Sequence, residues 1–136
     1  PKDYSRLTIS TLSTHDTSNW LEWWNSEASN QKKKNLLRVV FEENAPLFLS
    51  LEKLITKNLE SINKASSIFC VLMLTEWLFL GSFLDRDKPS DYRFNIPGTI
   101  SDKNWSLRMP APLEELLEQP SNSKIKEIIT KTKRTP

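Results

Sequence analysis

Near the amino terminus the segment Leu7-Thr8-Ile9-Ser10-Thr11-Leu12 is followed directly by the polar segment Ser13-Thr14-His15-Asp16-Thr17. The first part alternates and is rich in β-branched residues, which predicts a strand over residues 7–12. The second part predicts a loop over residues 13–18 at the carboxyl end of that strand. In α/β proteins this end carries the binding and catalytic groups. His15, the single histidine of the chain, and Asp16 are therefore candidate functional residues.

A second strand is predicted over residues 68–74, which are continuously apolar and bounded by polar residues. Such a run is typical of a strand buried on both faces of a parallel sheet. About fifty residues of largely helical pattern separate the two strands, as a βαβ unit with a helical insertion requires. The clearest helical period lies in Leu51, Leu54, Ile55, Leu59 and Ile62, and the helix before it carries Leu36, Leu37, Val40 and Phe41.

Shorter signals place the remaining elements. Asn19 and Glu22 resemble a capping box that opens a helix through Trp24, and the polar residues 26–34 separate this helix from the next one. Asn44 and Pro46 are expected to interrupt the helical pattern that follows. A short helix is predicted over residues 75–80, a long ordered loop over 82–112, a helix from Pro112, and a last helix with Ile125, Ile128 and Ile129.

The element order predicts an α/β fold. Two strands do not make a sheet with both faces covered, so the pattern is that of the end of a larger α/β fold. The 136 residues suffice for one modest domain, and a net charge of +2 gives no indication of nucleic-acid binding. Cys70 is the single cysteine, which excludes an internal disulfide and predicts a small buried residue in a reducing compartment.

Two carboxylates stand at predicted strand ends. Asp16 is a candidate general base, charge stabiliser or ligand of sugar hydroxyls, and its alternative is an Asx turn or helix cap. Glu76 follows the second strand and is a candidate for the same face, or else a surface or cap carboxylate. Glycoside chemistry needs such a pair. Trp20, Trp23 and Trp24 are expected to pack their helix, whereas Trp105 lies in a Pro/Gly-rich loop suited to ligand contact.

Several motifs in order resemble the 4-α-glucanotransferases (disproportionating enzyme, or amylomaltase; glycoside hydrolase family 77). Ser13–Thr17 with Trp23-Trp24 resembles the family segment that carries the third catalytic carboxylate. Leu78–Ser82 resembles the segment after the last barrel strand. The family's C-terminal loop, of the form N-x-P-G…N-W…R, and the helix after it are matched by Asn95–Thr99, Asn104-Trp105, Arg108 and Leu113–Leu117.

The resemblance implies a fold and a set of roles. The fold is the C-terminal part of a (β/α)8 TIM barrel, namely its last two strands with helical insertions and C-terminal helices. Residues 1–136 would be one segment of a single catalytic domain without an internal boundary. The mechanism would be a retaining double displacement in which Asp16 stabilises the transition state. His15 would bind the same sugar, and Asn104 and Trp105 would line the donor side of the cleft.

The resemblance also implies limits. Glu76 would be a further substrate contact, although Glu76-Trp77 stands where the family often has Gln-Asp. No segment matches the nucleophile or the acid/base, so the isolated chain is expected to be inactive and to expose apolar strand faces.

The expected partners are maltooligosaccharides and the remainder of the barrel, without nucleic acid, membrane, cofactor or metal. The expected location is the cytoplasm, or the plastid in a plant or alga. The alternative is a non-catalytic carbohydrate-binding or interaction module.

Overall fold

A computed structural model describes residues 1–42 and 48–134, and Asn44 and Pro46 therefore lie outside the described residues. The chain divides into two compact units. The first comprises Pro1–Thr11, Ala28–Val71 and Ser123–Pro136, and the second comprises Leu12–Glu27 and Leu72–Asn122.

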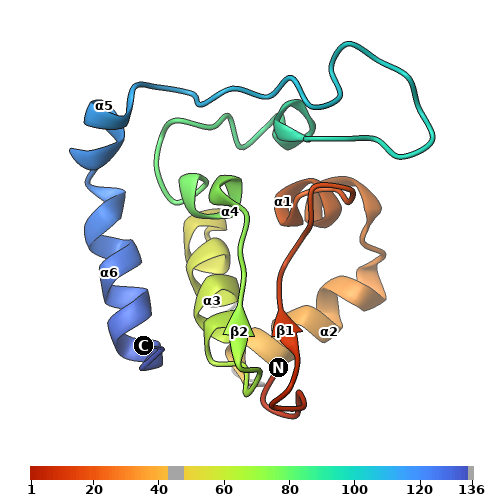
Figure 1. The fold of residues 1–136 in the computed structure, drawn as a ribbon. Helices are drawn as coiled ribbons and strands as arrows, with labels where there is room; N and C mark the ends of the chain where they lie inside the picture. The colour runs from red at the N-terminus through yellow and green to blue at the C-terminus, as the bar shows by residue number, and fades with distance from the viewer. Residues whose placement is uncertain (43–47, 135–136) are drawn as a thin grey trace. The chain divides into compact units, whose positions relative to one another are not determined.

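The first unit contains a parallel pair of strands, β1 (Ile9–Ser10) and β2 (Phe69–Cys70), which run side by side in Figure 1. Ile9 pairs with Phe69 and Ser10 with Cys70. The amide of Val71 donates to the carbonyl of Ser10 at 2.9 Å and continues the ladder. The predicted parallel βαβ arrangement is confirmed, but each strand is only two residues long, shorter than the apolar runs suggested.

The prediction that the second strand is buried on both faces is wrong for this structure. Phe69 is 59% exposed and Val71 is also exposed, while Ile9 on the partner strand is 63% exposed. Burial on both faces needs further strands and covering layers, and this sheet has two strands among the described residues. The expectation of exposed apolar strand faces is thereby confirmed. Cys70 is a free thiol and is half-buried rather than buried.

In its described residues the first unit also contains three helices: α2 (Asn30–Phe41), α3 (Leu51–Asn63) and α6 (Ser121–Thr132), which belongs to this unit from Ser123 onward. Ser29 and Ser50 cap α2 and α3, because their side chains accept hydrogen bonds from the amides of Lys32 and Lys53. The cap at Ser29 starts α2 inside the stretch predicted to be a polar separator. The core residues confirm the helical period of α3 and include Val40, Leu54, Ile55, Leu59, Ile62 and Ile128.

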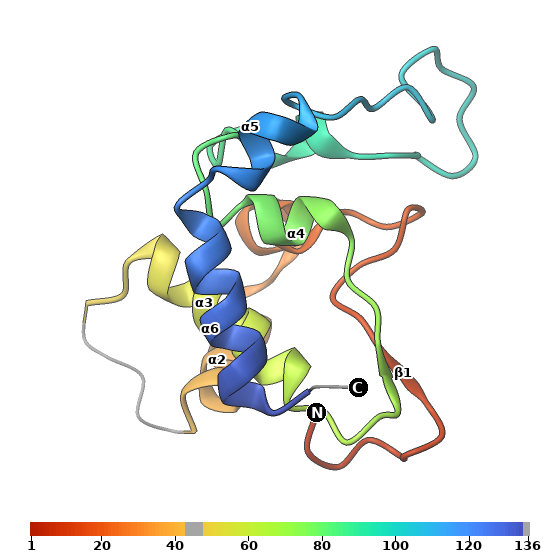
Figure 2. The same ribbon diagram turned by 60° about the vertical axis from the view of Figure 1, so that its left-hand side comes forward.

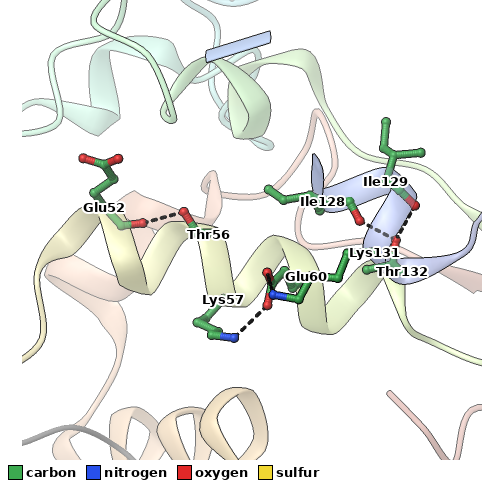
Figure 3. A network of polar contacts seen from close by, with 8 residues as sticks. All are labelled: Glu52, Thr56, Lys57, Glu60, Ile128, Ile129, Lys131 and Thr132. Atoms are coloured by element: carbon green, nitrogen blue, oxygen red, sulfur yellow. Dashed lines mark hydrogen bonds and ion pairs between the residues drawn. The ribbon is translucent and has the colours of Figure 1, made fainter. Parts of the chain in front are cut away.

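Ion pairs and hydrogen bonds join α6 to α3 in the first unit (Figure 3). Glu60 of α3 accepts from Lys57 at 2.8 Å and from Lys131 of α6 at 2.7 Å. Lys124 pairs with Glu52 near the other end of the two helices. The guanidinium of Arg134 donates to the carbonyl oxygen of Asn63 at 2.8 Å, so it also holds the end of α3. Figure 2 shows the two helices from a second side.

The second unit is built from short elements. These are α1 (Trp20–Glu22), a π-helical turn η1 (Trp23–Glu27), α4 (Leu74–Leu78), a 3-10 helix η2 (Pro89–Tyr92) and α5 (Leu113–Leu117). The predicted cap of α1 is confirmed, since Asn19 Oδ1 accepts from the amide of Glu22 at 2.9 Å. The core of this unit is formed by Trp20, Leu21, Phe79, Leu80 and Leu84.

The long segment predicted as an ordered loop contains only η2 and hydrogen-bonded turns before α5 begins at Leu113. It runs from green through teal to blue in Figures 1 and 2, between α4 and α5. Helix α5 starts after Pro112, as predicted. Across residues 1–42 and 48–134, no helix has the length and apolar character needed to cross a membrane. In the same part of the chain, no three metal-ligating side chains gather.

Candidate functional site

His15 and Asp16 lie at the tip of a tight turn in the second unit. The turn is closed by the amide of Thr17, which donates to the carbonyl of Thr14 at 3.2 Å, and by the amide of Thr14, which donates to Thr17 Oγ1 at 2.9 Å. The side chains of His15 and Asp16 are 52% and 50% exposed. Closure of the turn by its two threonines therefore leaves the imidazole and the carboxylate free to face solvent or a ligand.

Asn95 reaches the carboxylate of Asp16 from the distant loop. Asn95 Nδ2 donates to Asp16 Oδ1 at 2.8 Å, and His15 Nε2 lies 3.3 Å from Asp16 Oδ2. Each carboxylate oxygen thus faces one protein group. Because an ionised carboxylate offers about four lone-pair positions, Asp16 can still accept hydrogen bonds from a ligand.

Trp105 completes the cluster from the same distant loop. Its indole lies 5.1 Å from the His15 imidazole, measured between ring centroids, with the planes tilted by 45°. Trp105 is 64% exposed, so its indole offers a flat apolar surface beside Asp16 and His15. Its backbone has φ of +61°, a left-handed conformation that is uncommon for a bulky residue. A hydrogen bond of 2.7 Å from the Trp105 amide to the Phe94 carbonyl holds this conformation.

Asn104 shapes the loop that carries Asn95. Its Oδ1 accepts from the amide of Ile96 at 3.2 Å, and its Nδ2 donates to the carbonyl and Oγ1 of Thr99 at 3.1 and 3.2 Å. Gly98, at φ +78°, supplies the left-handed turn between them, which glycine adopts at no steric cost. The side-chain amide of Asn104 therefore forms its hydrogen bonds within the loop.

A cavity of about 460 Å³ adjoins this loop. Asn95 and Asn104 both lie in its wall, so the cavity and the Asp16 cluster share a border at Asn95. Its wall carries three basic side chains, Arg93, Lys103 and Arg108, beside polar and apolar ones. Its lining consists of Ser90, Asp91, Arg93, Asn95, Ile96, Lys103, Asn104, Ser106, Leu107 and Arg108.

Two further contacts join the segment around α1 to the segment around η2. Asn19 Nδ2 donates to the carbonyl of Pro89 at 2.7 Å in a buried position. Arg93 Nη1 donates to Glu22 Oε1 at 3.4 Å. Burial raises the pKa of the Glu22 carboxyl, and the Arg93 guanidinium opposes the rise. Together with the Asn95–Asp16 hydrogen bond, these contacts hold the segment that carries Asp16 against the loop that carries Asn95.

Glu76 of α4 lies in the interior, with 2% of its surface exposed. Its Oε1 accepts a hydrogen bond from Ser13 Oγ and another, of 3.0 Å, from the backbone amide of Trp20. Burial raises the pKa of the Glu76 carboxyl, and the two hydrogen bonds limit the rise. This geometry is that of a cap carboxylate at the start of α1, one of the alternatives left open by the sequence.

The structure thus brings His15, Asp16 and Trp105 together and sets Asn104 in the supporting loop. Asn95 is a contact of Asp16 that the sequence analysis did not propose. Its signal was its position as the first residue of the Asn95–Thr99 motif. Trp20 and Trp24 stack with centroids 6.0 Å apart, which fits the packing role expected of the tryptophans in residues 20–24.

A family model described as 4-alpha-glucanotransferase matches residues 1–114. The 4-alpha-glucanotransferase of Chlamydia pneumoniae is 35% identical over 131 residues, which cover 95% of this chain and 24% of that protein. That of Chlamydia trachomatis is 32% identical over 127 residues, which cover 93% of this chain and 23% of that protein. The chain therefore spans about a quarter of the length of the curated relatives it matches.

The fold is similar to that of a solved amylomaltase from Streptococcus agalactiae in complex with acarbose. The TM-score is 0.71 and the sequence identity is 25%, and the match covers all of this chain and 24% of the amylomaltase chain. This match and the helices around the parallel strand pair fit an α/β fragment. Since the family model covers most of the sequence, this chain belongs to the 4-alpha-glucanotransferase family, glycoside hydrolase family 77.

Proposed function

We propose that this chain is part of a 4-alpha-glucanotransferase that transfers α-1,4-glucan segments between maltooligosaccharides by a retaining double displacement. It would form the C-terminal part of a (β/α)8 barrel: the last two strands, helical insertions and C-terminal helices, within one catalytic domain. Family membership supports the activity. The parallel pair β1 and β2, with apolar side chains exposed on both strands, supports a place in a larger sheet.

The Asp16 cluster is the observation that carries this proposal. In a retaining mechanism one carboxylate attacks the anomeric carbon and a second protonates the leaving oxygen and later activates the acceptor. Asp16 would be the third carboxylate and would accept hydrogen bonds from hydroxyls of the reacting glucose. Such bonds accelerate the reaction if they strengthen as the ring flattens toward the oxocarbenium-like transition state.

The surroundings of Asp16 suit that role. Asn95 holds Oδ1, which orients the carboxylate while half of the Asp16 side chain stays exposed. A charged acceptor forms stronger hydrogen bonds with hydroxyls than a neutral one does. His15 would bind the same sugar, and the exposed indole of Trp105 would stack on a glucose ring on the donor side.

Asn104 and the cavity beside it would form the donor-side wall, with Asn104 acting chiefly through the shape of the loop. Glu76 is too deeply buried to reach a sugar in this structure, so we assign it to the support of the site. The nucleophile and the acid/base would come from parts of the enzyme outside this chain, and the isolated chain would be inactive. The enzyme would need no cofactor and would work in the cytoplasm, or in the plastid of a plant or alga.

The test is disproportionation of maltotriose by the full-length protein that contains this chain, with Asp16→Asn as the variant. We expect kcat to fall by roughly 10²- to 10³-fold, as when a preorganised transition-state contact is lost, with KM changed only a few-fold. Asp87→Asn replaces an exposed carboxylate elsewhere in the second unit and should leave both constants unchanged.

Two outcomes would contradict the proposal. An unchanged kcat in Asp16→Asn would remove the role assigned to Asp16. A wild-type protein that binds maltooligosaccharides without redistributing them would instead be a carbohydrate-binding module.

A further inference from the structure

Glu76 occupies an unusual position for a carboxylate that faces no substrate. It lies in the first turn of α4 with 2% of its surface exposed, and its Oε1 accepts two hydrogen bonds from protein donors. A buried carboxylate is costly unless such donors satisfy it. Both donors come from one stretch of chain, on either side of the Asp16 turn.

The two donors bracket the turn that carries the cluster. Ser13 immediately precedes residues 14–19 and Trp20 immediately follows them, so one oxygen atom of Glu76 ties both ends of this loop to α4. The Trp20 amide is also the first amide of α1 and has no acceptor within its own helix. Glu76 therefore sets where the loop ends and where α1 begins.

The other supports of the loop act on separate points. Asn19 links the end of the loop to Pro89, and Asn95 holds the Asp16 carboxylate itself. Neither contact reaches Ser13. Loss of Glu76 would leave the Ser13 hydroxyl and the Trp20 amide without this acceptor, and the loop would spread at its base.

We propose that Glu76 is a positioning residue for Asp16: it fixes the base of the loop so that the Asp16 carboxylate meets the reacting sugar. This inference rests on the proposed function. Catalysis is sensitive to such placement, because a displacement of about 1 Å can cost on the order of 10²-fold in rate. Glutamine keeps the Oε1 acceptor without the charge, so it should retain the position of the loop.

The test uses the full-length protein and maltotriose disproportionation, with Glu76→Gln and Glu76→Leu. We expect Glu76→Gln to keep kcat within about threefold of wild type, because both hydrogen bonds can still form. Glu76→Leu should lower kcat by roughly 10- to 100-fold with a much smaller change in KM. Glu114→Gln and Glu114→Leu, at an exposed carboxylate of α5, are the matched controls and should behave like wild type.

A double variant separates positioning from a general loss of structure. In an Asp16→Asn background, Glu76→Leu should cost less than about threefold in kcat, because its effect passes through the carboxylate already removed. A structural defect would instead cost the same factor in both backgrounds. If Glu76→Leu does not fold, Ser13→Ala serves instead, because it removes one of the two hydrogen bonds to Glu76. Its smaller loss of kcat should likewise disappear in the Asp16→Asn background.

Equal losses of kcat in both backgrounds would overturn this inference, as would an unchanged kcat in both Glu76→Leu and Ser13→Ala. In either case a low kcat in Asp16→Asn would still support the proposed function. A full-length wild type that does not redistribute maltotriose would overturn the proposed function, and the role of Glu76 with it.

Discussion

At the scale of the residue, the backbone of Trp105 links strain to the site. An aromatic residue at φ +61° lies in a region that costs of order 1–3 kcal/mol, and the ring of this same residue contacts His15. Such strain persists where surrounding contacts hold it, here the hydrogen bond to Phe94. The conformation is therefore consistent with a residue kept for ligand contact rather than for stability.

This interpretation predicts opposite effects on stability and on substrate binding. Trp105→Gly should be more stable than Trp105→Ala by about 1 kcal/mol, because glycine adopts a positive φ without strain. Both variants should bind maltooligosaccharides more weakly than wild type. Thermal unfolding and a titration with maltotriose on the full-length protein measure the two effects.

Ile100 provides the control for Trp105. It is fully exposed and has no positive φ, so alanine should there be at least as stable as glycine. If alanine were the better residue at position 105 as well, the backbone strain would have no energetic consequence.

At the scale of the element, the pairing of α6 with α3 depends on one carboxylate. Burial disfavours ionisation of Glu60, yet the hydrogen bonds from Lys131 and Lys57 outweigh it and lower the pKa of the carboxyl. A carboxyl with a lowered pKa stabilises the folded state above its unfolded pKa and loses that contribution as the pH falls through the folded value. Glu60 therefore makes the attachment of α6 sensitive to acid.

The predicted result is a difference in pH dependence between wild type and Glu60→Gln. From neutral pH down to below the ordinary carboxyl range, wild type should lose more stability than the variant. The coupling between Glu60 and Lys131 in a double-mutant cycle should be at most about 1 kcal/mol, since Lys131 is half exposed. Unfolding midpoints of the full-length protein across this pH range measure both quantities, and parallel curves would contradict the prediction.

At the scale of the whole molecule, apolar side chains on both strands of the first unit are open to solvent. Leu7, Ile9, Phe69 and Val71 are all exposed. Exposed apolar residues on neighbouring strands indicate a surface that another layer or strand covers. In the proposed barrel, the cover is the remainder of the catalytic domain.

Substitution on this face tests that arrangement. Phe69→Ser should destabilise the full-length protein by about 3 kcal/mol, as expected for truncation of a buried aromatic residue. Phe48→Ser is the matched control, because Phe48 is 93% exposed in the same unit and should cost less than about 0.5 kcal/mol. Equal midpoints of thermal unfolding for the two variants would show that Phe69 stays exposed in the full-length protein.

Local features of this protein follow from the sequence. These features depend on residues close together in the chain: the helical period of α3, the cap at Asn19, the start of α5 after Pro112 and the approximate places of both strands. The strands are shorter than predicted, because apolar runs report the propensity for a strand and not the number of residues that find a partner. Helix α2 begins earlier than predicted, because the serine cap at Ser29 outweighs the polar stretch around it.

The α/β class, the family resemblance and the candidate residues His15, Asp16 and Trp105 could all be inferred from the order of amino acids alone. The fold was needed to show that Asn95 meets Asp16, that Trp105 lies against His15 and that Glu76 is buried beneath the loop. The difference lies in the range of the interactions. Caps and helical periods involve neighbours in the chain, whereas the partner and the burial of a side chain depend on distant segments that only folding brings together.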